Sequence, residues 1–167
     1  KAVEYIYKLK NRDKKKPIAI FLPNIETAEK IFIFSKKAKE IAQKFSQESL
    51  TLVLKKQPDP LINLAKNLNE NDDFLGFRIV EKKFIRELLQ TFGGVLAVTS
   101  ANISGASSAI SADEVKKYFN FDDSVLLIDG GTCQEKIPSA VIKIVLGSNS
   151  DSICEKSIAE LNFHSWV

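Results

Sequence analysis

The chain has 167 residues, of which 44% are hydrophobic and 27% are charged, and its formal net charge is +3. This composition is typical of a soluble globular protein and excludes a disordered chain, so we expect a single domain over residues 1–167. With one histidine and two distant cysteines, the sequence argues against a zinc site, a disulfide scaffold and histidine-dependent catalysis. No apolar run approaches the ~20 residues of a membrane helix, and no signal peptide is visible, so a cytoplasmic location is expected.

Hydrophobic periodicity predicts the elements of the first half of the chain. The opening residues carry apolar side chains at helical spacing and predict a helix that ends near Leu9. A buried strand is predicted over 17–22, a helical segment over 27–45 with a break near Ser35, and a strand over 49–54. Residues 59–73 are polar and rich in asparagine, which predicts turns with at most a short helix over 61–68.

The second half continues to alternate between strands and helices. Strands are predicted over 75–80, 95–99, 124–128 and 140–145, with a turn at 129–131 between the last two. A helix over 82–92 ends at Gly93 and Gly94. Ser111 and Glu114 form a capping-box pattern ahead of a helix that reaches about Phe119. A last helix is predicted over 155–161.

The order of these elements predicts an α/β (α+β) fold. The strands are almost continuously apolar, which indicates a sheet covered by helices on at least one face. Some connections are too short for the crossover that parallel neighbours need. We therefore expect a twisted sheet with both parallel and antiparallel pairs and with flanking helices.

Two polar segments are candidates for a phosphate-binding site. Lys10 and Arg12 follow the opening helix, and an arginine fork with a lysine charge can converge on one polyphosphate. Any basic loop contains the same pair, so a solvated loop is the alternative. Ser100 and Asn102 lie in the loop 99–105 after an apolar strand, where α/β sheets bind ligands. These side chains can donate to phosphate oxygens or hold the loop together through local turns.

Two further side chains are candidates for substrate contacts. Arg78 interrupts an apolar strand, so it either faces solvent or directs its guanidinium into a cleft, where it can hold a carboxylate. Ser139 begins the strand 140–145, and its hydroxyl can hydrogen-bond in the same cleft. No spacing of carboxylates indicates acid–base catalysis, and no Walker or Rossmann phosphate loop is present. The residues alone predict a cleft and not a reaction.

Taken in chain order, these segments resemble the YrdC-like family of threonylcarbamoyl-AMP synthases. The run Thr-Ser-Ala-Asn-Ile-Ser-Gly over 99–105 is the specific part of the resemblance. The similar segments together span most of the chain: 6–12 with Lys16-Pro17, 50–54, 76–79, 96–105, 129–131 and 138–141.

The resemblance implies an enzyme that makes threonylcarbamoyl-AMP and pyrophosphate from L-threonine, bicarbonate and ATP, with Mg²⁺. The product would serve threonylcarbamoyladenosine modification of tRNA. The resemblance also implies tRNA or double-stranded RNA as a partner, together with the proteins of the threonylcarbamoyl-transfer pathway. The implied contacts are ATP phosphates for Lys10, Arg12, Ser100 and Asn102, and threonine for Arg78 and Ser139.

The sequence also departs from the family pattern. A strand of the type Pro-Thr-Asp-Thr-Val-Tyr-Gly-Leu, which supplies part of the threonine pocket, is absent, and we expect residues upstream of Lys1. Phe21 replaces a histidine, 46–49 replaces a Trp-Pro-Gly-Pro turn, Lys136 replaces a glycine, and Cys154 replaces an arginine. Beside an active enzyme, two alternatives stay open. One is a catalytically impaired RNA-binding module that uses the lysine-rich start of the chain. The other is a domain of a larger carbamoyl-transferring maturation factor.

Overall fold

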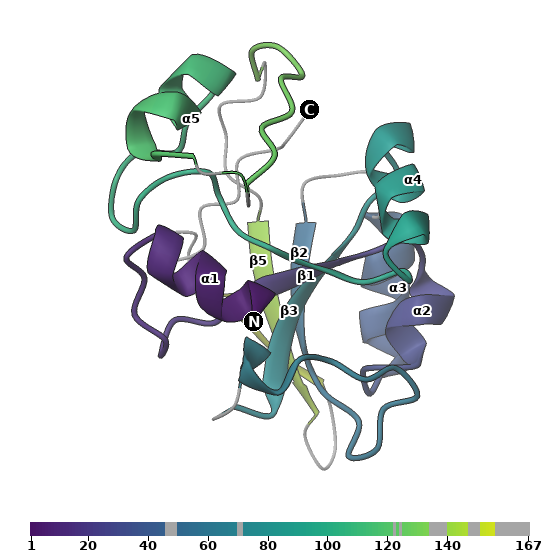
Figure 1. The fold of residues 1–167 in the computed structure, drawn as a ribbon. Helices are drawn as coiled ribbons and strands as arrows, with labels where there is room; N and C mark the ends of the chain where they lie inside the picture. Colours follow the sequence, from purple (N-terminus) through teal and green to yellow (C-terminus); the bar gives the residue numbers. More distant parts are fainter. Residues whose placement is uncertain are drawn as a thin grey trace.

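The computed structural model describes residues 1–45, 50–69, 72–121, 123, 125–133, 140–146 and 151–155. Its strands form one six-stranded sheet in the order β4-β1-β3-β2-β5-β6 (Figure 1). The strands are β1 (Ala19–Leu22), β2 (Leu50–Lys55), β3 (Phe74–Ile79), β4 (Leu96–Val98), β5 (Ala140–Leu146) and β6 (Asp151–Glu155). β1 runs parallel to β3 and β2 runs parallel to β5, while the other three pairs are antiparallel. The mixed sheet expected from the sequence is confirmed.

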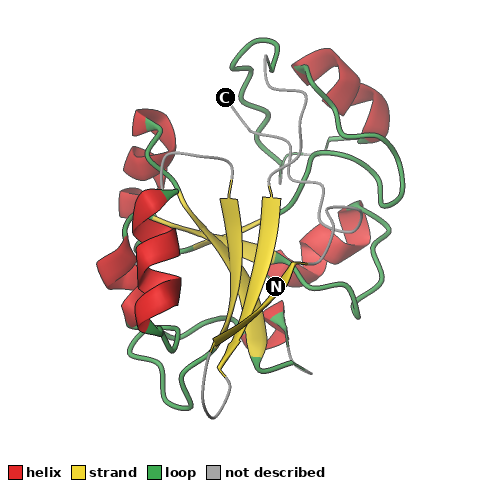
Figure 2. Cartoon of the chain, turned by 180° about the vertical axis from the view of Figure 1, so that it is seen from behind, coloured by secondary structure: helices red, strands yellow, loops and turns green. Residues whose placement is uncertain are grey.

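The helices flank this sheet. They are α1 (Ala2–Leu9), α2 (Ile25–Glu29), α3 (Lys36–Lys44), the 3₁₀ turn η1 (Lys66–Leu68), α4 (Lys83–Thr91) and α5 (Ala112–Tyr118). In the views of Figures 1 and 2, α2, α3 and α4 lie near one another, and α1 and α5 lie across the strands from them. The side-chain contacts separate them further: α2 and α3 pack on the sheet face that carries Ile20 and Phe77, whereas Leu89 of α4 packs against Phe21 on the opposite face. Every helix in the described ranges is too short or too polar to cross a membrane.

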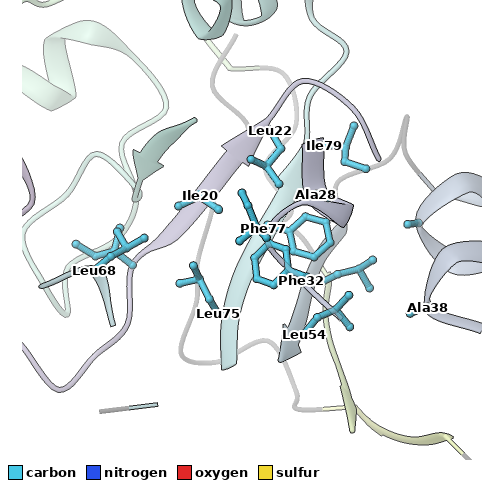
Figure 3. Close-up of a cluster of buried hydrophobic side chains, with 14 of the residues drawn as sticks. Ile20, Leu22, Ala28, Phe32, Ala38, Leu54, Leu68, Leu75, Phe77 and Ile79 are labelled. Atoms are coloured by element: carbon cyan, nitrogen blue, oxygen red, sulfur yellow. The ribbon is translucent and has the colours of Figure 1, made fainter. Parts of the chain in front are cut away.

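The main core is built by the alternation of side chains along the strands. Leu75 and Phe77 of β3 face a cluster that includes Ala28 and Phe32 from the α2 region (Figure 3). The rings of Phe32 and Phe77 stack with their centroids 4.5 Å apart. Because successive residues of a strand point to opposite faces, residues 74, 76 and 78 face away from this cluster.

Local sequence signals set the helix ends. Gly93 and Gly94 have φ values of 83° and 88°. The Gly94 amide donates to the Leu89 carbonyl at 2.6 Å, as in a Schellman ending. At the start of α5, the Ser111 hydroxyl accepts from the Glu114 amide at 3.3 Å, while the Glu114 carboxylate accepts from the amide of Ile110 at 2.9 Å. The predicted cap is confirmed, with its return bond displaced by one residue from the usual capping box.

Among the remaining sequence expectations, the strand over 124–128 is wrong. The break expected near Ser35 in the helical segment over 27–45 is confirmed, because Asn24 caps α2, Ser35 caps α3, and residues 30–35 between the two helices are not helical. The expected strand over 124–128 is absent from 125–128, where Leu126 is 82% exposed and no neighbouring strand pairs with it. The helix expected from about 155 to 161 falls almost wholly on residues 156–161, which lie outside the described part; Glu155 itself ends β6.

Candidate phosphate-binding site

The end of α1 is a turn that separates two cations in space. Asn11 has a φ of 49°, in the left-handed region that asparagine tolerates better than most residues. The Arg12 amide donates to the Tyr7 carbonyl at 2.9 Å and the Asn11 amide donates to the Lys8 carbonyl at 3.1 Å. This is a Schellman ending with asparagine in the usual glycine position. Lys10 therefore stays in the last helical turn, while Arg12 enters the segment that leads to β1.

Strand direction brings the two predicted segments together. β4 is antiparallel to β1, and Ala19 pairs with Val98. The loop that follows β4 therefore begins beside the residues that enter β1, which are the residues that follow α1. The sequence predicts that this loop lies beyond the carboxyl end of β4. The antiparallel pairing places the amino end of β1, and with it the basic segment, beside that loop.

Lys10 joins α1 to this loop through a set of hydrogen bonds that we name the Lys10 cluster: Lys10, Ser100, Asn102, Ser104 and Ala106. The ammonium donates to the carbonyls of Ser100 and Asn102 and to Asn102 Oδ1, the last at 3.0 Å. Ser100 Oγ donates to the same Oδ1 at 2.5 Å, and Asn102 Nδ2 donates to the Ala106 carbonyl at 2.6 Å. In return, the Ser104 amide donates to the Lys10 carbonyl at 2.9 Å.

The centre of the Lys10 cluster is buried and positively charged, while Ser100, Ser104 and Ala106 are half-buried. Lys10 is 3% exposed and Asn102 is 5% exposed. Burial, and secondly the charge of Arg12, lowers the pKa of Lys10 to about 8. Among the ion pairs of the described residues, none joins an Asp or Glu to Lys10 or Arg12. A buried cation that meets only neutral acceptors leaves a local positive potential, which an anion would offset.

Arg12 braces the segment that leads into β1. Its Nε donates to the Lys16 carbonyl at 3.4 Å and its Nη2 donates to the Pro17 carbonyl at 2.9 Å. Burial lowers the pKa of Arg12, but an arginine remains charged at any physiological pH. Two of its five N–H groups are used in these bonds, so the guanidinium retains donors for a ligand.

A small apolar cluster holds the loop from behind. Val115 of α5 and Phe119, which follows the helix, pack in one cluster with Leu9 at the end of α1 and Ala101 in the loop. α5 therefore fixes the two halves of the site against each other on the side away from the sheet core. The sequence contained no signal for this support, because the apolar residues of α5 read as an ordinary amphipathic face.

The other predicted site residues lie elsewhere. Arg78 pairs with Phe21 in the register of β3 and β1, on the sheet face opposite Phe77, and is not a member of the Lys10 cluster. Ser139, Lys136 and residues 46–49 lie outside the described residues, and only the backbone of Cys154 is described, in β6. Phe21, the residue in place of the family histidine, is 8% exposed and packs with Leu89 of α4.

A cleft of about 470 Å³ lies beside the same basic segment. It is lined by Glu4, Tyr7, Lys14, Lys15, Pro17, Asn67, Asn69 and Asp72. Its lining includes two lysines and two carboxylates, so its charge is mixed and it lacks the uncompensated positive potential of the Lys10 cluster. Within the described ranges, no group of three or more His, Cys, Asp or Glu side chains is placed to hold a metal ion.

Comparison with known proteins gives a family and several named relatives. Residues 1–155 match the model of the Sua5/YciO/YrdC family, which is described as telomere recombination. A putative threonylcarbamoyl-AMP synthase of Methanocaldococcus jannaschii is 38% identical over 145 residues, with 86% of this chain and 65% of the relative covered. The threonylcarbamoyl-AMP synthase of Rattus norvegicus is 32% identical over 130 residues, with 78% and 44% covered. The chain thus spans less than two thirds of the length of each.

Solved structures have the same fold. P. abyssi Sua5 complexed with L-threonine superposes with a TM-score of 0.75 at 26% identity, covering 98% of this chain and 49% of that protein. E. coli YciO superposes with a TM-score of 0.72 at 17% identity, covering 94% and 73%, and this likeness concerns the fold alone. The resemblance drawn from the sequence is therefore confirmed at the level of family and fold.

Proposed function

Because the chain belongs to the Sua5/YciO/YrdC family, we propose that it makes threonylcarbamoyl-AMP and pyrophosphate from L-threonine, bicarbonate and ATP. The observation that carries this proposal is the buried Lys10 at the centre of its cluster, with Arg12 nearby and no carboxylate paired to either cation among the described residues. Such a site favours a ligand with several negative charges, and a triphosphate is the substrate of this class of reaction.

The reaction needs positioning and cations more than covalent help from side chains. The threonine amine and bicarbonate condense to N-carboxy-threonine with loss of water, and a carbamate oxygen then attacks the α-phosphorus of ATP. The bond from that phosphorus to the bridging oxygen breaks, and pyrophosphate leaves with its electron pair. Holding two reactants in line lowers the barrier by ~7–11 kcal/mol. Preorganised positive charge, here the guanidinium of Arg12 with Lys10 behind it, stabilises the developing charge.

Mg²⁺ is proposed to arrive with the nucleotide. Magnesium sites in proteins of this kind use substrate phosphates and few protein ligands, because the ion retains several waters. Arg12 would then contact phosphate oxygens that the metal leaves free.

The threonine side of the reaction is proposed to involve Arg78 and Ser139. Arg78 lies on the sheet face opposite the Phe77 core, where its guanidinium can bind a carboxylate through two hydrogen bonds. Support comes from the relative P. abyssi Sua5, whose structure was solved in complex with L-threonine. The product would then pass to the proteins that transfer the threonylcarbamoyl group to tRNA.

The direct test is pyrophosphate release from this protein with ATP and bicarbonate, measured with and without L-threonine. We expect release to depend on threonine, and Arg12→Ala to raise the KM for ATP by about tenfold or more, the size of one lost charged hydrogen bond. Lys8→Ala, which removes an exposed charge from the same helix, is the matched control and should leave KM unchanged. Release that ignores threonine would disprove this function.

A second proposed activity is RNA binding by the basic segment. Lys14, Lys15 and Lys16 are consecutive and exposed. Their position supports contacts with RNA phosphates, which do not depend on the base sequence. Binding of tRNA or duplex RNA should weaken steeply with salt, because each neutralised phosphate releases counterions. An affinity that does not change between 50 and 200 mM salt would exclude phosphate-driven binding.

A further inference from the structure

The Lys10 ammonium has no spare donor for a ligand. An ammonium carries three N–H bonds, and three acceptor atoms are within hydrogen-bond distance: two carbonyl oxygens of the loop and Asn102 Oδ1. Most of the Asn102 amide is occupied as well, since its Oδ1 accepts from both Lys10 and Ser100 and one N–H of its Nδ2 donates to the Ala106 carbonyl. A phosphate that bound Lys10 directly would have to displace one of these loop bonds.

The bonds also run in both directions between α1 and the loop. Lys10 donates through its side chain and accepts through its carbonyl, from the Ser104 amide. The loop amides of Asn102 and Ala106 are used within the loop, on the carbonyls of Ser100 and Ile103. The loop 100–106 is thus held in one conformation by contacts that centre on a single buried side chain.

Arg12 differs from Lys10 in each of these respects. It is half-buried, it donates to carbonyls of its own segment, and its guanidinium has further N–H groups. The two cations that a sequence motif places together therefore have different surroundings.

We propose that Lys10 is a positioning residue, which fixes the loop 100–106 against α1 so that Arg12 and the loop present one preformed anion site. Direct contact with the phosphates then belongs to Arg12, and Lys10 adds its charge from behind the loop. This assignment rests on the proposed function for the identity of the anion, but the loop-fixing role stands on the free protein. A compact ammonium suits three acceptors that converge on one point, whereas the planar guanidinium fork of arginine does not.

The test compares Lys10→Met and Lys10→Arg with the control Lys8→Met. The first measurement is hydrogen exchange of the Ser104 amide without any nucleotide, relative to the Phe77 amide in the sheet. We expect the exchange rate of the Ser104 amide to increase by about tenfold or more in both Lys10 variants. The exchange rate of the Phe77 amide should increase less, and Lys8→Met should leave both rates unchanged. Unchanged exchange at Ser104 would overturn the proposal. Equal acceleration at Ser104 and Phe77 would also overturn it, since Lys10 would then support the whole fold and not the loop.

The second measurement is pyrophosphate release at saturating ATP and L-threonine. A positioning role predicts that kcat falls by about tenfold or more in Lys10→Met and that Lys10→Arg does not rescue it, although the charge is kept. Rescue of kcat by Lys10→Arg to within twofold would assign Lys10 a direct charge contact and refute the proposal. If the unsubstituted protein releases no pyrophosphate, the proposed function fails, while the exchange measurement still decides the role of Lys10.

Discussion

Replacing Asn102 by alanine tests how much of the stability of the protein depends on the site loop. The substitution removes one hydrogen bond from a charged donor, Lys10, and two neutral ones, with Ser100 and Ala106. A charged hydrogen bond contributes roughly 1.5–3 kcal/mol and a neutral one roughly 0.5–1.5 kcal/mol. Bonds that share atoms are not additive, and Lys10 retains two carbonyl acceptors. We therefore expect a loss of about 3 kcal/mol in the free energy of unfolding.

Urea denaturation at 25 °C, followed by circular dichroism, measures this loss as a lower transition midpoint with an unchanged slope. Asn63→Ala removes an exposed asparagine outside the site and should change the stability by less than about 0.5 kcal/mol. A loss below about 1 kcal/mol for Asn102→Ala would refute the reasoning. The loop bonds would then not belong to the cooperative unit that unfolds with the sheet.

Three further outcomes are expected. Phe77→Ala should lower the free energy of unfolding by about 3–5 kcal/mol, because it removes a buried ring and leaves a cavity in the core; thermal melting measures this, and a loss under about 1 kcal/mol would contradict it. Gly76→Ala should be tolerated to within about 1 kcal/mol in the same melt, since a Cβ there would meet its neighbours at 3.5–3.7 Å and at an ordinary φ. ATP affinity should fall as the pH rises through about 8, the pKa of Lys10 in the free protein. Binding of the anion favours protonated Lys10, so protons are taken up near and above that pH while Arg12 stays charged. Calorimetry in buffers of different ionisation enthalpy measures this proton uptake. Its absence would show that the charge of Lys10 does not interact with the bound anion.

The sequence predicted the sheet well where hydrophobic runs were flanked by strong turn signals. The boundaries of β1, β2, β3 and β5 fall within two residues of expectation, because buried strands need apolar side chains on both faces. The failures occurred where burial, not propensity, decides the structure. Residues 125–128 are rich in strand formers but pair with no strand, and β6 pairs with β5 although its composition is mixed.

The site was predicted in part for the same reason. The side-chain chemistry of Lys10, Ser100 and Asn102 indicates a polar site. The antiparallel pairing of β4 with β1, which the sequence does not show, brings these residues together. The sequence could not show that Lys10 would be buried with its donors occupied, since this depends on loop carbonyls that every residue carries. Asn11 was the overlooked signal, because an asparagine two residues after a helix end is typical of a left-handed turn.

The hydrogen bond from Lys10 to Asn102 spans 92 positions of the chain, and this has a consequence for biosynthesis. At roughly 5–20 residues per second, a ribosome needs several seconds to extend the nascent chain from one partner to the other. During that interval the Lys10 side chain is hydrated, because the loop that buries it has not been made, and burial does not yet lower its pKa. The proposed nucleotide site should therefore form late, after the strand at 96–98 has paired with β1 at the edge of the sheet.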